Sequence, residues 1–407
     1  MNKTGSVKFG ILWNSLQQFG QLGITFVSTI ILARLLTPED YGIYGILMIF
    51  ISVSEMLADS GIAGYIIKKQ NVTPIYYDTL FVYNMCVSGI MYLFLFFSAP
   101  FIADFYEKEM LISVIRILGL VLLLHAFSIT QFTRLLKDLQ FHKLALISIV
   151  AGVAALCVAL LLAYRGLGIW ALIFQQLVLV ALTTILYLVV NRRIPHFRFD
   201  MRVFKEQFAF GINLFGSSVL MAITNNIGNN IIAKIFSMNI AGLYVQAVRL
   251  QNYPLSMVSN VVDKTFFPIF SKMNDDWRLL KEQICKLRRL LYAVLFPLFS
   301  VAICFAKPIV SIVLGEKWLG SVSYFQILML ASFPLLVKAL NRNVLKSFGF
   351  TAVIFRIEVY SAVLLLFCLF IAFLFKSILV VLLAVVLGQS FSALFLSLIP
   401  ISEPTRL

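Results

Sequence analysis

The chain has few of the groups that carry catalysis or bind a metal. Of its 407 residues only three are histidines and five are cysteines, and none of them falls at metal-ligand or redox spacing. It has no GxxxxGK[ST] loop for binding nucleotide phosphates and no polar stretch long enough to form a soluble domain. We therefore expect no enzyme activity, no metal, no cofactor, no disulfide and no self-contained ATP-driven pump.

Acidic residues are also scarce, with 18 of them against 33 basic residues and a net charge of +15. Such an excess can indicate a nucleic-acid partner. However, 61% of the residues are hydrophobic and the mean hydropathy is +0.96, far more than a soluble core requires. Basic loops beside anionic lipid headgroups explain the charge, so we expect membrane lipids and no nucleic acid as partners.

Long apolar runs dominate the sequence. A helix needs about 20 apolar residues to cross the hydrocarbon layer of a bilayer. Twelve such runs predict an all-α integral membrane protein of about 12 transmembrane helices, at residues 9–34, 41–66, 79–102, 111–130, 145–164, 168–190, 210–236, 241–267, 290–314, 320–341, 352–375 and 377–399.

The distribution of basic residues predicts the topology. Every second loop is rich in lysine and arginine, and short cytoplasmic loops collect positive charge. This pattern places both termini in the cytoplasm and the protein in the cytoplasmic (inner) membrane. The basic segment Trp277–Leu291 has two interpretations, a helix lying on the membrane surface or a cytoplasmic extension of the ninth helix.

An internal duplication divides the chain. Residues 33–44 (ARLLTPEDYGIY) and 233–244 (AKIFSMNIAGLY) match at equal spacing, and each joins two long apolar runs. Because six helices separate the copies, the two halves should be parallel. We predict a six-helix lobe at 1–190, a cytoplasmic linker at 191–209 and a second six-helix lobe at 210–407. A central cavity between such lobes is typical of a transporter.

Several motifs resemble a known family. They are ARLLTPEDYGIYGILMIFISVSEMLADSGIAGYIIKK at 33–69, GLYVQAVRLQNYP at 242–254, FPIFSK at 267–272, LGEKW at 314–318, FQIL at 325–328 and KSFG at 346–349. The chain resembles the polysaccharide and O-antigen flippases of the multidrug, oligosaccharidyl-lipid and polysaccharide exporter superfamily. It is most similar to their branch of colanic-acid and other exopolysaccharide exporters.

The resemblance implies a function. Such proteins flip an undecaprenyl-diphosphate-linked oligosaccharide from the inner to the outer leaflet by alternating access, for lipopolysaccharide, O-antigen or exopolysaccharide synthesis. It also implies possible partners in a polysaccharide polymerase and chain-length machinery. A drug or cation antiporter of the same superfamily is the alternative, and a membrane-embedded glycan polymerase or glycosyltransferase is a more distant one.

Amide side chains form a stripe on each of the two duplicated helices. Helical spacing puts them on one face, and each amide offers donors and acceptors to glycan hydroxyls. Amides in membrane helices also serve as interhelical contacts, and that interpretation stays open. The residues are Asn14, Gln17, Gln18 and Gln21 on the first helix and Asn225, Asn226, Asn229 and Asn230 on the seventh.

Arg249 is the candidate for binding the diphosphate. It lies well inside the eighth predicted helix, where an arginine facing lipid is costly and is expected to face protein or water. Its guanidinium matches phosphate oxygens and stays charged. The alternative is an arginine that reaches outward to the interface or pairs with a carboxylate.

Glu55 and Asp59 are the candidates for ion coupling. They are four residues apart on the second helix and share a face. Two carboxylates so close in a low dielectric do not both ionise easily, so one of them is suited to binding and releasing a proton. Alternatively, Glu55 pairs with a cation such as Arg249 and Asp59 lies near the inner interface.

Overall fold

The computed structural model describes residues 3–59, 62–69, 71–193, 195–261, 277–347 and 351–398. Within these ranges the chain is helical apart from short connections, and no strand occurs there. The predicted all-α fold is confirmed. The helices are α1 (Lys3–Leu35), α2 (Pro38–Asp59), α3 (Ile62–Lys68), α4 (Pro74–Tyr106), α5 (Met110–Lys137), α6 (Phe141–Tyr164), α7 (Ile169–Asn191), α8 (Met201–Ile235), α9 (Met238–Val261), α11 (Trp277–Cys304), α12 (Ala306–Val313), the 3-10 helix η2 (Glu316–Ser321), α13 (Val322–Ser347), α14 (Thr351–Phe375) and α15 (Ile378–Leu398).

Most of these helices can cross a membrane. Among the described residues, nine are long and apolar enough, and the bent pair α11–α12 would make a tenth. The helices α8 and α9 overlap the predicted spans 210–236 and 241–267, but neither is among these nine, and residues 262–267 lie outside the described residues. The predicted second span, 41–66, differs, because α2 ends at Asp59 and α3 begins at Ile62. With seven residues, α3 is too short to span a bilayer.

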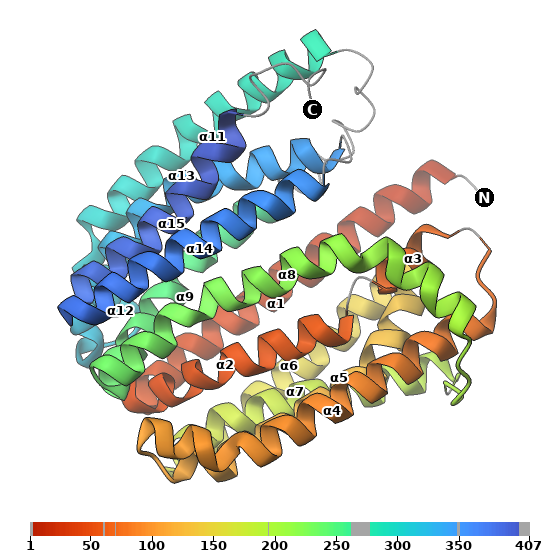
Figure 1. Cartoon of the computed structure of the whole chain (residues 1–407), viewed down its shortest axis with the longest axis horizontal. Helices are drawn as coiled ribbons and strands as arrows, with labels where there is room; N and C mark the ends of the chain where they lie inside the picture. The colour runs from red at the N-terminus through yellow and green to blue at the C-terminus, as the bar shows by residue number, and fades with distance from the viewer. Residues whose placement is uncertain are drawn as a thin grey trace. The chain divides into compact units, whose positions relative to one another are not determined.

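The chain forms two compact units, Met1–Ile223 and Thr224–Leu407. In the first unit α5 packs against α4 and α7, α6 against α1 and α7, and α2 against α4, α5 and α7. In the second unit α13 packs against α9, α11 and α15, and α14 packs against α15 (Figure 1). The predicted lobe limits at 190 and 210 stay a prediction.

The duplicated segments form the same corner in each unit. Thr37 stands between α1 and α2, and its hydroxyl accepts the backbone N–H of Asp40 at 3.3 Å. Ser237 stands between α8 and α9, and its hydroxyl accepts the backbone N–H of Ile240 at 3.2 Å. Hydroxyl residues are favoured at this position because they satisfy an unpaired N–H at the start of a helix. The two copies of the repeat are therefore similar in local structure as well as in sequence.

The predicted ninth span, 290–314, is broken. The α11 and α12 axes differ by 75° across Phe305. Pro308, in the first turn of α12, has no N–H to bond to the carbonyl of Cys304, and its ring would clash with a continuing helix. Upstream of the break, α11 is continuous from Trp277. Of the two interpretations of 277–291, the structure has the extension of the ninth helix.

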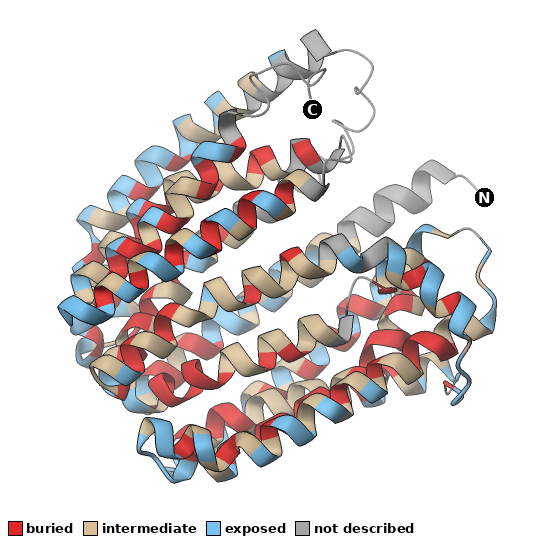
Figure 2. Ribbon diagram, viewed as in Figure 1, coloured by how far each residue is buried: buried red, intermediate tan, exposed pale blue. Residues whose placement is uncertain are grey.

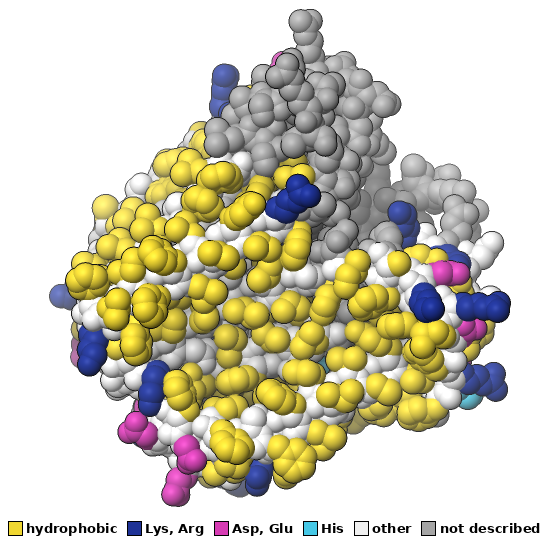
Figure 3. Space-filling view, viewed as in Figure 1, with side chains coloured by type: hydrophobic (Ala, Val, Ile, Leu, Met, Phe, Trp, Pro, Cys, Tyr) yellow, Lys and Arg dark blue, Asp and Glu magenta, His cyan; other side chains and the backbone are white. Residues whose placement is uncertain are grey.

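Many large apolar side chains lie outward, and small residues line buried faces of some helices. On α4, Phe94, Phe97, Phe101 and Phe105 are exposed, and the face in view is mostly hydrophobic, with charged side chains towards the helix ends (Figures 2 and 3). On α6 the buried alanines recur every fourth residue from Ala151 to Ala163, which lets neighbouring helices approach closely. This is the pattern of a multi-pass membrane protein.

Candidate functional site

The predicted amide stripe of α8 surrounds Gly228, which the side chain of Tyr244 on α9 approaches. Asn225 is exposed, Asn226 is half-buried and Asn229 is buried. Between them, Gly228 leaves room for α9, since a Cβ there would lie 3.2 Å from the hydroxyl oxygen of Tyr244. A side chain at this position would require the tyrosine hydroxyl to shift by a few tenths of an ångström. The side chain of Tyr244 on α9 thus lies beside the stretch of α8 that carries the amides.

A buried glutamine on α9 adds to this stretch. In the antiparallel α8–α9 hairpin, the contact between Gly228 and Tyr244 places Gln246 level with Asn226. Gln246 is completely buried, and within the described part of the chain neither its amide nor that of Asn229 has a hydrogen-bond partner. Buried amides are nearly always hydrogen-bonded. These two residues therefore retain unused donors and acceptors.

Other amides nearby are satisfied. The side-chain N–H of Gln251 donates to the carbonyl of Leu328 at 2.5 Å and to the hydroxyl of Ser332 at 3.2 Å, which fastens α9 to α13. The amide N–H of Asn230 donates to the carbonyl of Asn226 at 3.1 Å, within α8. For these residues the interpretation as structural contacts fits the geometry.

Arg249 shares a face of α9 with Gln246, three residues earlier. It is half-buried and lies within one turn of the level of Asn226. It stands about 16 Å along α9 from the first residue of that helix. A guanidinium beside unsatisfied amides has the donors that phosphate oxygens need and the mixed polarity that hydroxyl groups need.

The remaining candidates belong to the first unit. Gln18 on α1 and Glu55 on α2 are both half-buried, and Glu55 follows the buried Ser54. The side chains of Asn14 and Asp59 lie outside the described residues. The roles of these four residues stay predictions, as do those of Asn225, Asn226, Asn229 and Arg249.

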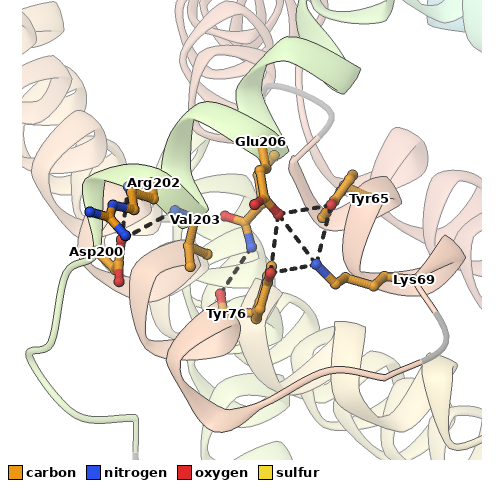
Figure 4. Close-up of polar contacts among 8 residues, drawn as sticks. Tyr65, Lys69, Tyr76, Asp200, Arg202, Val203 and Glu206 are labelled. Atoms are coloured by element: carbon orange, nitrogen blue, oxygen red, sulfur yellow. Dashed lines mark hydrogen bonds and ion pairs between the residues drawn. The ribbon is translucent and has the colours of Figure 1, made fainter.

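A polar cluster that we did not predict joins the start of α8 to α3 and α4 (Figure 4). The carboxylate of Glu206 accepts hydrogen bonds from the hydroxyls of Tyr65 and Tyr76, each at 3.1 Å, and forms an ion pair of 3.3 Å with Lys69. The ammonium of Lys69 also donates to the hydroxyl of Tyr76 and lies 4.2 Å from the centre of its ring. We name these four residues the Glu206 cluster.

The segment before α8 is fastened to the same unit. Asp78 accepts the backbone N–H of His196 at 3.1 Å, and Thr79 accepts that of Asp200 at 3.2 Å. Phe204 and Phe208 pack on a core of Ile62, Ile66 and Leu80. Residues 195–208, part of the predicted linker, therefore make specific contacts with α3 and α4.

Sequence reasoning missed Gln246 and the buried ion pair between Lys338 on α13 and Glu358 on α14. Gln246 could have been predicted as a site residue, because it precedes Arg249 by about one helical turn in an apolar segment. The ion pair could not have been predicted, because nothing in the sequence indicates that these two helices face each other.

Comparison with solved structures defines the class of fold. An inward-facing MATE multidrug resistance transporter of the MOP superfamily matches with a TM-score of 0.73 at 14% identity, over 96% of this chain and 97% of that one. The lipid II flippase MurJ, in an inward closed conformation, matches with a TM-score of 0.76 at 12% identity, over 97% and 88%. The chain has the fold of these membrane transporters. Residues 31–323 match the family described as "Polysaccharide biosynthesis protein", and the protein belongs to that family.

Curated relatives agree with the resemblance found in the motifs. The teichuronic acid biosynthesis protein TuaB of Bacillus subtilis is 26% identical over 366 residues, which are 89% of this chain and 75% of TuaB. The lipopolysaccharide biosynthesis protein WzxC of Escherichia coli is 24% identical over 78% of this chain and 65% of its own. The succinoglycan biosynthesis transport protein ExoT of Rhizobium meliloti is 24% identical over 75% and 62%. The chain spans less than two thirds of the last two relatives.

Proposed function

We propose that the protein flips a lipid-linked oligosaccharide, carried on undecaprenyl diphosphate, from the inner to the outer leaflet of the cytoplasmic membrane by alternating access. Three relatives are named for the biosynthesis or transport of surface polysaccharides. The fold is shared with the lipid II flippase MurJ. The glycan itself is not specified by any of these likenesses.

One observation carries the proposal more than the others. On α8 and α9 the buried amides of Asn229 and Gln246 have no partner in the described chain, and both lie within about two turns of Arg249. A cation that binds diphosphate and amides that bind sugar hydroxyls suit the two ends of this substrate. A purely structural stripe would have its amides paired, as in Gln251.

The alternative functions fit these residues less well. The fold does not distinguish a multidrug transporter from a flippase, since both kinds match with similar TM-scores. A drug or cation antiporter, however, carries cations, which Arg249 would repel. A glycan polymerase or glycosyltransferase needs a catalytic constellation, which the sequence does not supply.

Further parts of the proposal concern topology, coupling and partners. Both termini lie in the cytoplasm, as the basic loops indicate. Glu55 and Asp59 on α2 bind and release the coupling proton. A polysaccharide polymerase and its chain-length machinery take over the flipped product. The protein itself acts as a transporter without enzymatic turnover.

Proteoliposomes test the function directly. A fluorescent undecaprenyl-diphosphate oligosaccharide is followed by its accessibility to an external glycosidase, with wild type, Arg249→Ala and Arg249→Lys side by side. Arg165→Ala is the matched control, because Arg165 is an exposed arginine at the end of α6.

We expect protein-dependent flipping that falls about tenfold or more in Arg249→Ala, the loss of one charge-assisted contact. Arg249→Lys should recover part of it, since lysine keeps the charge without the bidentate geometry. Flipping that is the same in Arg249→Ala and in wild type would refute the site. No flipping of several glycans, together with transport of a small organic cation, would favour the antiporter.

A further inference from the structure

A layer of polar side chains lies inside the first unit, where α2 packs against α4 and α5. It consists of Ser54 on α2, Asn84 on α4 and Thr130 on α5, which are 2%, 0% and 0% exposed. Within the described part of the chain, neither amide atom of Asn84 and neither of the two hydroxyls has a hydrogen-bond partner. Buried polar groups are nearly always hydrogen-bonded. We name these three residues the Asn84 layer.

The packing of α4 on α5 brings two of these side chains together. Two contacts fix the register of this antiparallel pair, the rings of Phe81 and Phe127 with centres 5.2 Å apart and the ring of Tyr92 against Gly119. Asn84 follows Phe81 by three residues and Thr130 follows Phe127 by three, which puts both on the same side of the seam between the helices. They stand about 8 Å apart along the axes. Because each Cβ tilts towards the start of its own helix, the two side chains lean towards each other.

The third side chain comes from α2 at the same level. The hydroxyl of Tyr83 on α4 donates to the carbonyl of Leu57 on α2 at 3.3 Å, which fixes the height of α2 beside α4. Ser54 is about one turn before Leu57, and Asn84 directly follows Tyr83. Ser54 and Asn84 are therefore level to within about one helical turn. Three helices thus bring neutral polar side chains to one place in the interior of the unit.

The nearest histidine, arginine and carboxylate on α4 and α5 lie outside this layer. His125 is about 140° around α5 from Thr130. Arg134 is one turn further along α5, and its guanidinium carbon lies 4.6 Å from the centre of a tyrosine ring. Asp78 is about 9 Å along α4 from Asn84 and accepts a backbone N–H from the segment before α8. An ion without a charged partner is costly in such surroundings, so the layer suits a small neutral molecule.

Water has the hydrogen-bonding groups that the layer requires. The amide of Asn84 needs acceptors for its N–H groups and a donor for its oxygen, and each hydroxyl can both donate and accept. A buried water makes about three hydrogen bonds to polar groups that the protein itself does not satisfy. A water between the three side chains would therefore bond to groups from all three helices at once.

We propose that Ser54, Asn84 and Thr130 bind one or more internal water molecules, and that this water hydrates Glu55 and exchanges its proton. Glu55 is the residue after Ser54 on α2 and is half-buried. Neighbouring Cα atoms are about 3.8 Å apart, so a glutamate side chain can reach a water bound to Ser54. Proton transfer needs such a hydrogen-bonded neighbour. The role for Glu55 rests on the proposed function, whereas the water site does not depend on it.

A structure of the wild-type protein at a resolution that shows water tests the site directly. We expect a water within hydrogen-bond distance of at least two of the three side chains. A direct hydrogen bond between Asn84 and Thr130, with no water beside them, would overturn the proposal. This test needs no variant and no transport.

Thermal unfolding tests the same site with apolar variants of similar shape, Ser54→Ala, Asn84→Leu and Thr130→Val. Each single change leaves the bound water with fewer partners, so it should lower the Tm by about 2 °C or more. The triple variant needs no water and should recover much of that loss. Thr133→Val is the matched control, because Thr133 is also buried on α5 but its hydroxyl donates to the carbonyl of Ile129 at 2.7 Å.

Double variants show whether the groups share a water. Asn84→Leu and Thr130→Val should be strongly non-additive in their effect on Tm, whereas Asn84→Leu and Thr133→Val should add. If the single variants each raised the Tm and combined additively, the three groups would be dry and independent, and the water site would be wrong.

Proteoliposomes with an imposed proton gradient test the link to Glu55. The triple variant keeps Glu55 but has a dry layer, so its flipping should no longer respond to the gradient. An unchanged response would show that the water takes no part in proton exchange and would refute that role. If wild type flips no glycan at all, the proposed function falls, and the structure and the Tm measurements still decide whether the water site exists.

Discussion

Lys69 and Glu206 are 137 positions apart in the sequence, yet their charged groups lie 3.3 Å apart. Two tyrosines complete the contact by donating to the same carboxylate. Through this cluster, the first turns of α8 are bound to α3 and to the start of α4. The charged groups are at the surface, so their contribution depends on pH and salt.

The Glu206 cluster predicts a pH-dependent stability. Hydrogen bonds from Lys69, followed by those from Tyr65 and Tyr76, hold the pKa of Glu206 below the ordinary value of 4.5. A carboxylate with a lowered pKa in the folded state stabilises that state above its unfolded pKa, and the contribution is lost as the pH falls through the folded value. Glu206→Gln should therefore lower the Tm at neutral pH, and its effect should shrink as the pH falls through the lowered pKa of Glu206.

The pKa of Lys69 shifts in the opposite direction to that of Glu206. The hydrogen bond to Tyr76, followed by the contacts with Tyr65 and Glu206, raises the pKa of Lys69 above its ordinary range. Its contribution is complete at neutral pH and is lost only as a strongly alkaline pH passes the raised value. Glu39→Gln is the control, since Glu39 forms an exposed ion pair with Lys108. A Tm difference for Glu206→Gln that persisted unchanged at acidic pH would show that packing, and not charge, is responsible.

The unpartnered amides can be separated from structural ones by replacement with leucine. Gln246→Leu and Asn229→Leu should keep or raise the Tm, because no described hydrogen bond is broken and apolar area is gained. Flipping should nevertheless fall. Gln251→Leu should lose about 1–2 kcal/mol of unfolding free energy, because it breaks the bonds to Leu328 and Ser332. If all three variants were destabilised alike, the distinction between the two kinds of amide would be unfounded.

Two glycines between α6 and α7 give a matched stability test. Both have positive φ, 74° at Gly166 and 53° at Gly168, so alanine costs on the order of 1–3 kcal/mol of backbone strain at either one. A Cβ at Gly168 would also lie 2.8 Å from a carboxylate oxygen of Asp40, whereas nothing lies within 4 Å at Gly166. Thermal unfolding should show Gly168→Ala to be the more destabilised, and the reverse order would contradict the contact with α2.

Proton coupling through α2 predicts a specific loss of response. In proteoliposomes with an imposed proton gradient, flipping by wild type should depend on the gradient, whereas Glu55→Gln, which cannot exchange a proton, should not respond to it. Glu109→Gln is the control, because Glu109 is exposed at the start of α5. An unchanged gradient response in Glu55→Gln would remove this residue from the coupling step.

The sequence predicted the fold because bilayer solvation imposes a simple rule. Long apolar runs must be helices, and the two copies of the repeat place Thr37 and Ser237 at equivalent corners. The break at Phe305 was missed although Pro308 signals it, because hydropathy alone does not see the missing N–H of proline.

The polar sites were predicted less completely because they depend on which helix faces meet. Helical spacing placed Asn226 and Asn229 on α8 but could not show that the side chain of Tyr244 on α9 approaches Gly228 between them. The pairing of Lys338 with Glu358 depends on the packing of α13, α14 and α15, and no local pattern encodes it. The Glu206 cluster likewise joins residues from distant segments.

The equivalent corners at Thr37 and Ser237 also show how the two copies have diverged. In that alignment Arg249 corresponds to Ile49 and Gln246 to the buried Ile46, whereas Glu55 corresponds to the buried Leu255. The proposed anion-binding cation thus exists only in the second copy, and the proposed proton-binding carboxylate only in the first. If both proposals hold, the two copies share one corner geometry but differ in function, because neither copy alone has both the proposed cargo site and the proposed ion site.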